Sequence, residues 1–176
     1  DSRRKQISGD FGYGWDLSLS SIKLNESCAP GKYWSQKNTS SMFGSKYFFS
    51  EDRVHEISMD YGNGQVDKFK MKLSPDQQNL YPINYGISVS YEAQGNTKST
   101  LEAIGTTTDL IYNGGVLCYN STITPYAPSQ YKLARADGTV YILSAANGVE
   151  KITDTNGNVI TFTENGVTHS DGKSIT

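Results

Sequence analysis

The last forty residues repeat one short pattern three times, and this repeat constrains the fold more than any other feature of the chain. Each copy is an Asp-Gly or Asn-Gly dipeptide followed by a run of β-prone residues, and the copies begin at Asp137, Asn156 and Asp171. These dipeptides are the strongest short hairpin signals, because both central residues of a type I′ turn take a positive φ. The repeat therefore predicts an antiparallel β-meander.

Two further Asn-Gly turns lie between the copies. The expected structural turn glycines are Gly138, Gly148, Gly157 and Gly166, which are spaced 10, 9 and 9 residues apart. This spacing suits strands of about four to six residues joined by short turns. The third copy stops at Thr176, within its strand, and we therefore expect the sequence to be a piece of a longer β-repeat protein.

Alternating side chains predict strands elsewhere in the chain. Phe69, Met71 and Leu73 alternate with three lysines, which indicates an antiparallel strand with one face in the core and the other in water. With turn signals about every 8 to 12 residues, the sequence predicts an all-β fold of antiparallel meander and hairpin repeats. These repeats would form an open sheet, a sandwich or a partial β-shell of roughly 11 to 13 strands.

The regularity of the strands changes along the chain. Residues 1–127 are expected to form an irregular β region, and residues 128–176 the hairpin repeats. Within the first region, the polar residues 25–45 are expected to form a loop, because Pro, Gly, Ser, Asn and Thr are the common residues of turns.

Composition narrows the classes of partner. The formal net charge of −2 gives no electrostatic reason to expect nucleic acid as a partner. No apolar run approaches the roughly 20 residues that a membrane span needs, so no membrane span is expected.

Cys28 and Cys118 lie ninety residues apart without metal-site spacing. They are expected to be buried free thiols, with a disulfide as the alternative if the protein is exported.

Catalytic patterns are weak in this sequence. His55 lacks the second histidine that a zinc-protease helix carries four residues on, because Met59 stands there. His169 lies beside a turn and is interpreted as a structural residue. The chain has no Gly-x-Ser-x-Gly nucleophile elbow. We therefore expect no enzyme activity, no catalytic residue and no cofactor.

Residues 154–158 fit either a calcium-binding loop or a simple turn. Asp154, Asn156 and Asn158 have the spacing of the first three oxygen ligands of an EF-hand, but Val159 and Asn165 stand where the glycine and the bidentate glutamate belong. An Asx turn, in which the side chain binds its own backbone, explains the triplet better. No metal ligand is therefore expected.

Four aromatic residues are candidates for ligand binding. Tyr13, Trp15, Tyr33 and Trp34 carry rings that could stack on sugars, and the last two lie in the expected loop. The alternative is that these rings fill the core or close the end of a sheet. The sequence leaves both interpretations open.

Two segments together resemble the Rhs/YD-repeat family. FGYGWDLS (residues 11–18) resembles the motif that opens the repeat region in that family, and DGTVY with ITDTNGNVITF (residues 137–141 and 152–162) is similar to its repeat unit. The two matches occur in the family's order. The sequence departs from the family where FTENG (residues 162–166) replaces the segment that contains the Tyr-Asp dipeptide.

The resemblance implies a structural role. Rhs/YD repeats form a β-shell that encloses a toxin in bacterial proteins, or part of an adhesion receptor in teneurins. The resemblance therefore implies that this chain is a non-catalytic shell segment of a secreted or cell-surface protein, and that its partner is the remainder of its own polypeptide. The alternative is a β-module that binds carbohydrate or a cell-surface protein. A free sheet edge would also permit self-association.

Overall fold

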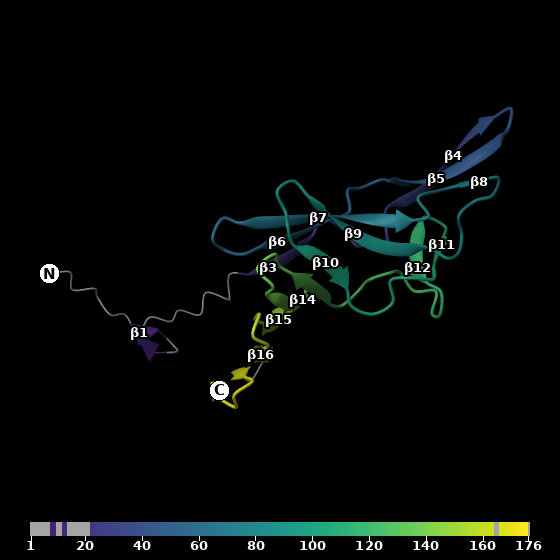
Figure 1. Cartoon of the computed structure of the whole chain (residues 1–176). Helices are drawn as coiled ribbons and strands as arrows, with labels where there is room; N and C mark the ends of the chain where they lie inside the picture. The colour runs from purple at the N-terminus through teal and green to yellow at the C-terminus, as the bar shows by residue number, and fades with distance from the viewer. Residues whose placement is uncertain (1–7, 10–11, 14–21, 164–165, 176) are drawn as a thin grey trace.

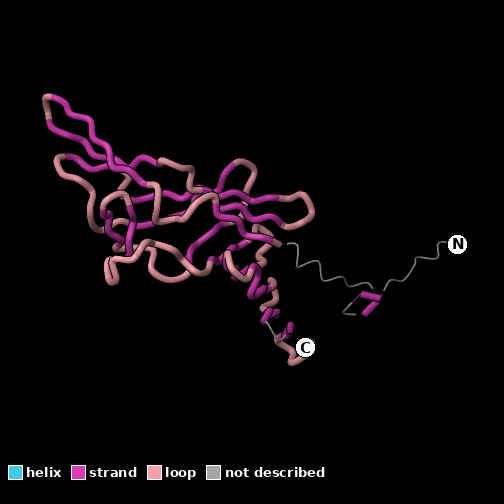
Figure 2. The backbone as a smooth tube through the Cα atoms, turned by 180° about the vertical axis from the view of Figure 1, so that it is seen from behind, coloured by secondary structure: helices cyan, strands magenta, loops and turns pink. Residues whose placement is uncertain are grey.

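The fold consists of strands joined by turns and loops. The computed structural model describes residues 8–9, 12–13, 22–163 and 166–175, and these residues contain no helix (Figures 1 and 2). The predicted all-β class is therefore confirmed. The sheets are open and antiparallel. No helix in the described residues is long and apolar enough to cross a membrane.

The strands follow one another closely along the chain. In chain order they are β1 Ser8–Gly9, β2 Gly12–Tyr13, β3 Lys23–Glu26, β4 Trp34–Ser41, β5 Gly44–Glu51, β6 Glu56–Asp60, β7 Val66–Ser74, β8 Gln77–Asn79, β9 Ser88–Gln94, β10 Thr100–Ala103, β11 Leu110–Asn113, β12 Val116–Tyr119, β13 Tyr131–Ala134, β14 Val140–Ser144, β15 Gly148–Thr153, β16 Val159–Thr163, β17 Gly166–His169 and β18 Ser174–Ile175.

Two sheets contribute to the main core. One has the strand order β3-β6-β7-β9, and the other has the order β10-β13-β14-β15-β16-β17-β18. Met59 and Phe69 of the first sheet pack in one buried cluster with Tyr131, Leu133 and Leu143 of the second. Fully burying side chains of this size contributes about 1.5–3 kcal/mol each, so this cluster holds the two sheets together.

The clearest predicted alternation is confirmed in β7. Phe69, Met71 and Leu73 are buried, whereas Lys68 and Lys72 are exposed on the opposite face. The buried row of β7 also reaches a second apolar cluster. That cluster joins β7 and β9 to β4, β11 and β12 and contains Trp34, Met71, Leu73, Ile83, Ile87, Val89, Leu110, Leu117 and Tyr126.

The loop expected over residues 25–45 is wrong for its second half. β4 pairs with β5 from Trp34↔Glu51 to Ser41↔Gly44, and this hairpin projects from the body of the molecule (Figures 1 and 2). The side chains of β4 are polar, but the ladder is made by backbone groups, which pair whatever the side-chain polarity. These polar residues therefore form a strand because β5 pairs with them and because Trp34, at the start of β4, is buried.

The C-terminal repeats form the predicted meander, from β13 to β18 in order. The expected turn glycines, Gly138, Gly148, Gly157 and Gly166, all have a positive φ. Figure 1 shows the later strands of this meander leading away from the region where the two sheets pack, at the end of the molecule opposite the β4–β5 hairpin.

In the three repeat copies, however, the predicted type I′ turns are wrong. In the first copy Gly138 N donates to Arg135 O and Arg135 N donates to Thr139 O. Gly138 has a φ of 88°, and Asp137 is not among the described non-glycine residues with a positive φ. This arrangement is a tight turn followed by a left-handed glycine, which forms a G1 β-bulge. One left-handed residue is sufficient for it, so Asp137 does not need a positive φ.

The Asx-turn interpretation of residues 154–158 is confirmed. Asp154 Oδ1 accepts hydrogen bonds from the backbone N–H groups of Asn156 and Asn158, each at 2.8 Å, and Oδ2 accepts one from Asn158 Nδ2 at 2.8 Å. The side-chain bond from Asn158 and these backbone bonds hold the pKa of Asp154 below its ordinary value. The carboxylate therefore shapes its own turn.

The two cysteines are free thiols. Cys118 is buried and Cys28 is partly buried. Burial raises the pKa of both thiols, so both are less reactive than an exposed cysteine. Of the two alternatives left by the sequence, the structure has the free-thiol form.

Candidate functional site

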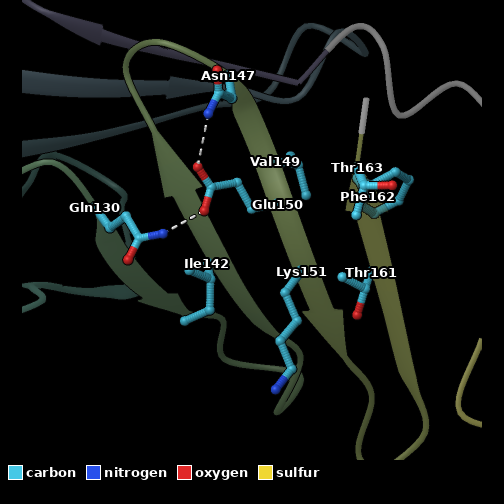
Figure 3. Close-up of a pocket in the computed structure, with 9 residues that line it drawn as sticks. All are labelled: Gln130, Ile142, Asn147, Val149, Glu150, Lys151, Thr161, Phe162 and Thr163. Carbon is cyan, nitrogen blue, oxygen red and sulfur yellow. Dashed lines mark hydrogen bonds between the residues drawn. The ribbon is translucent and has the colours of Figure 1, made fainter. Parts of the chain in front are cut away.

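A hollow lies on the outer face of the C-terminal sheet. It has a volume of about 700 Å³ and crosses β14, β15 and β16 (Figure 3). Ile142, Lys151 and Thr161 form one cross-strand row in it, because Ile142 pairs with Lys151 and Lys151 with Thr161. Tyr141 and Leu143, the neighbours of Ile142, point into the core. The row therefore lies on the face of the sheet opposite the core.

A β-bulge places a carboxylate in this groove. The β14–β15 register shifts between Ile142 and Leu143, which pair with Lys151 and Val149, so Glu150 is an extra residue. Such a bulge changes the direction of the side chain and is common next to functional sites. Figure 3 shows the Glu150 side chain lying between two amide side chains.

The Glu150 carboxylate is fixed by those two amides. Gln130 Nε2 donates to Glu150 Oε2 at 2.5 Å, and Asn147 Nδ2 donates to Glu150 Oε1 at 3.3 Å. Among the described ion pairs, none involves Glu150. A partly buried carboxylate held by neutral donors keeps lone pairs that can accept further hydrogen bonds. It is therefore suited to hydroxyl or amide groups of a ligand.

The groove offers hydrogen bonding together with a small apolar strip. Thr161 and Thr163 supply hydroxyl groups, Lys151 supplies an ammonium group, and Ile142 and Phe162 supply apolar surface. This combination fits a polar ligand in an extended form, such as an oligosaccharide or a polypeptide strand.

Neither histidine in the described residues hydrogen-bonds to a serine, threonine or cysteine side chain. His55 Nε2 donates to Lys32 O at 2.7 Å. His169 Nδ1 accepts from the backbone N–H of Asp171 and lies 2.8 Å from its carboxylate. Both histidines therefore bind backbone or carboxylate groups rather than a serine, threonine or cysteine. Within the described part of the chain, no three His, Cys, Asp or Glu side chains cluster as a metal site would require.

The predicted aromatic pair does not form one exposed platform. Trp34 is only 4% exposed, stacks on His55 with a ring separation of 4.1 Å, and donates from Nε1 to Pro30 O at 2.9 Å. Tyr33 is exposed, with the Arg53 guanidinium 4.3 Å from its ring centre. Tyr33 precedes β4 and has a φ of 64°, so it is not part of the extended strand that carries Trp34. For Trp34 the core interpretation is therefore the correct one.

The other two aromatic candidates lie in the N-terminal segment. The backbone of Tyr13 belongs to β2, paired with Ser8 of β1. Trp15 lies outside the described residues. A ligand-binding role for Tyr13, Trp15 and Tyr33 stays a prediction.

Sequence reasoning missed the groove residues. Gln130, Asn147 and Glu150 come from a segment before β13, a turn and a bulge, and no motif connects them in the sequence. The glycine spacing did not reveal the bulge, because the interval from Gly148 to Gly157 is nine residues, as is the interval from Gly157 to Gly166.

Comparison with known protein families, with curated proteins and with solved structures finds no match to this chain.

Proposed function

We propose that the chain is a non-catalytic segment of a β-shell in a secreted or cell-surface protein, where it encloses or presents another part of its own polypeptide. The observation that carries this proposal is the C-terminal meander, whose loops at Gly138, Gly157 and Gly172 repeat one hydrogen-bond pattern. A repeated hairpin unit extends a sheet by adding copies. The resemblance to Rhs/YD-repeat proteins points to the same role.

Partial burial of the last long strands supports the proposal. Leu143 in β14 is fully buried, whereas Ile160 and Phe162 in β16 and Val167 in β17 are only partly buried. Apolar side chains in a sheet gain stability when another layer covers them. The meander therefore has apolar surface available for a further layer, and in a shell that layer would be neighbouring polypeptide.

Hydrogen exchange of a longer polypeptide tests this role. The chain would be expressed with and without the sequence that follows it in its reading frame, and amide exchange would be compared in the two proteins. We expect slower exchange in β16 and β17 of the longer protein, because covered strands open less often. β7, whose apolar face is already buried, serves as the internal control. Unchanged exchange in β16 and β17 would contradict the shell proposal.

A second candidate function is supported by the groove of Figure 3. A β-module that binds carbohydrate would use the Glu150 carboxylate and the threonine hydroxyls of this groove. On a glycan array, a bound glycan should be lost or weakened about tenfold in Glu150→Gln, because a hydrogen bond to a charged group contributes about 1.5–3 kcal/mol. Glu102→Gln, at an exposed carboxylate in β10, is the matched control. Equal binding by both variants would exclude this groove as the glycan site.

A further inference from the structure

The turn between β4 and β5 carries two large apolar residues in full contact with solvent. Met42 is 95% exposed and Phe43 is 94% exposed. Turns of this kind usually hold Gly, Asn, Asp, Pro or Ser, whose backbone preferences or side-chain hydrogen bonds favour the bend. Met42 and Phe43 contribute nothing of that kind to folding. Their presence at this position therefore calls for an explanation outside the isolated fold.

The turn has a defined shape. Ser41 Oγ accepts from the backbone N–H of Phe43 at 3.2 Å and donates to Gly44 O at 3.2 Å. Gly44 has a φ of 122°. Ser40 and Ser45 Oγ lie 3.1 Å apart across the two strands. The hairpin therefore holds its two apolar residues at a fixed tip.

A third apolar side chain lies next to this tip. Leu80, which is 61% exposed, follows β8, and its backbone N–H donates to Ser45 O at 2.8 Å. Phe43 and Leu80 line the same surface hollow. We call Met42, Phe43 and Leu80 the tip patch.

The part of the β4–β5 hairpin nearest the tip patch carries only positive charge. Between Trp34 and Ser50 the chain has two charged residues, Lys37 in β4 and Lys46 in β5, and no aspartate or glutamate. Hydroxyl groups of serine and threonine occupy most of the surface between these lysines and the tip. A ligand that meets this end of the hairpin therefore meets apolar groups first, and cations and hydroxyls behind them.

We propose that the tip patch docks the protein on the surface of a lipid bilayer. Met42 and Phe43 enter the interfacial region, and Lys37 and Lys46 face the phosphate groups of the lipids. This is the arrangement of peripheral membrane anchors, in which apolar side chains are buried at the headgroup boundary and lysines bind anionic lipid.

The shape of the tip favours a bilayer over a protein pocket. The hairpin projects from the molecule in both views (Figures 1 and 2), and the tip patch comprises three side chains. A specific protein interface buries about 1,200–2,000 Å² and needs a complementary surface, whereas a fluid bilayer accepts a small apolar projection without one. With so few inserted side chains the binding is weak and reversible, comparable to a single acyl chain with an association constant on the order of 10⁴ M⁻¹.

Co-sedimentation with vesicles tests the proposal. The whole protein is mixed with vesicles of phosphatidylcholine, or of phosphatidylcholine with an equal amount of phosphatidylserine. The double variant Met42→Ser/Phe43→Ser should lose about tenfold or more in affinity for both vesicles. Because both side chains are exposed, its thermal unfolding should be unchanged. The matched control is Val54→Ser/Ile123→Ser, which replaces exposed apolar residues away from the tip and should bind as the wild type does.

Two further variants locate the contact. Phe43→Trp should show a blue shift of tryptophan fluorescence with vesicles, beyond any change in the wild type. Lys37→Gln/Lys46→Gln should lose the preference for vesicles that contain phosphatidylserine and keep its binding to phosphatidylcholine. Equal sedimentation of the wild type and the Met42→Ser/Phe43→Ser variant, or no added blue shift in Phe43→Trp, would overturn the proposal. If the wild type binds neither vesicle, the proposal is also overturned.

Discussion

Gly31 lies where separate segments of the chain are in direct backbone contact. Leu117 N donates to Gly31 O at 2.7 Å, and Tyr126 N donates to Leu117 O at 2.8 Å. A Cβ atom at position 31 would lie 2.6 Å from both Leu117 O and Tyr126 N. Backbone atoms cannot move aside as a flexible side chain can. At the scale of single residues, Gly31 therefore permits the loop before β4 to pack against β12.

We expect Gly31→Ala to destabilise the fold at the upper end of the range of about 1–3 kcal/mol that is typical of overpacking. The reason is the contact of the new methyl group with two backbone atoms. Urea unfolding monitored by tryptophan fluorescence measures the change. Gly95→Ala is the control, because a Cβ atom there meets nothing within 4 Å and only the left-handed backbone costs about 1–2 kcal/mol. Equal losses in the two variants would contradict the packing argument.

At the scale of single elements, the loops of the meander require glycine at one position. In the second copy Gly157 N donates to Asp154 O at 3.1 Å and Asp154 N donates to Asn158 O at 3.0 Å, which repeats the pattern of the first copy. Gly157 has a φ of 83°, and a Cβ atom there would meet nothing within 4 Å. The requirement for glycine at this position therefore comes from the backbone angle and not from crowding.

Gly157→Val should destabilise the β15–β16 hairpin by about 1–2 kcal/mol, because a β-branched residue is strained at positive φ. Gly157→Asn is the matched control and should cost less, since asparagine tolerates the left-handed region. Thermal unfolding and amide exchange of β15 and β16 provide the measurements. A valine variant as stable as the wild type would refute the assignment of a left-handed turn residue.

The whole molecule is extended, with two facing sheets in the middle. The β4–β5 hairpin projects from one end and the later strands of the C-terminal meander from the other (Figures 1 and 2). The second buried cluster, which includes Trp34, anchors the hairpin to the body. β4 has a partner on one side only, and unpaired edges promote association between copies. Self-association through such an edge stays a prediction.

Stability of the whole molecule should decrease on mild acidification because of His55. This side chain is only 3% exposed and stacks on Trp34. Burial lowers the pKa of His55; the Glu51 carboxylate acts in the opposite direction, and the Lys70 ammonium group acts in the same direction as burial. The folded protein therefore holds the ring neutral, whereas the unfolded chain binds a proton with a pKa of about 6.5. The stability that His55 contributes is complete above that pH and decreases as the pH falls toward the lower folded pKa.

The free energy of unfolding, measured in urea between about pH 7.5 and about pH 5, checks this expectation. This pH range brackets the unperturbed pKa of histidine. The slope that one proton adds is at most about 1.4 kcal/mol per pH unit. His55→Phe keeps a ring against Trp34 but does not titrate, so its stability should be lower overall and lack this slope. The same slope in both proteins would show that another group is responsible.

Several features of this protein follow from neighbouring residues and were predicted from the sequence. The all-β class, the alternation in β7 and the Asx turn at Asp154 depend on side-chain period and turn chemistry, which act over a few residues. The order of the meander follows from the same signals. The turn type was predicted wrongly, because Asp-Gly and Asn-Gly fit both a type I′ turn and a G1 bulge, and the ladder register selects between them.

Other features were decided by contacts between segments far apart in the chain. A polar sequence became strand β4 because β5 pairs with it, and Trp34 is buried because His55 and Pro30 lie against it. The Glu150 site depends on a bulge and on Gln130, which lies two strands away. The sequence alone therefore determined that the chain forms antiparallel β-repeats, because those signals are local. Only the tertiary structure decided which side chains of different strands lie together, because strand pairing and packing join residues that are far apart in the sequence.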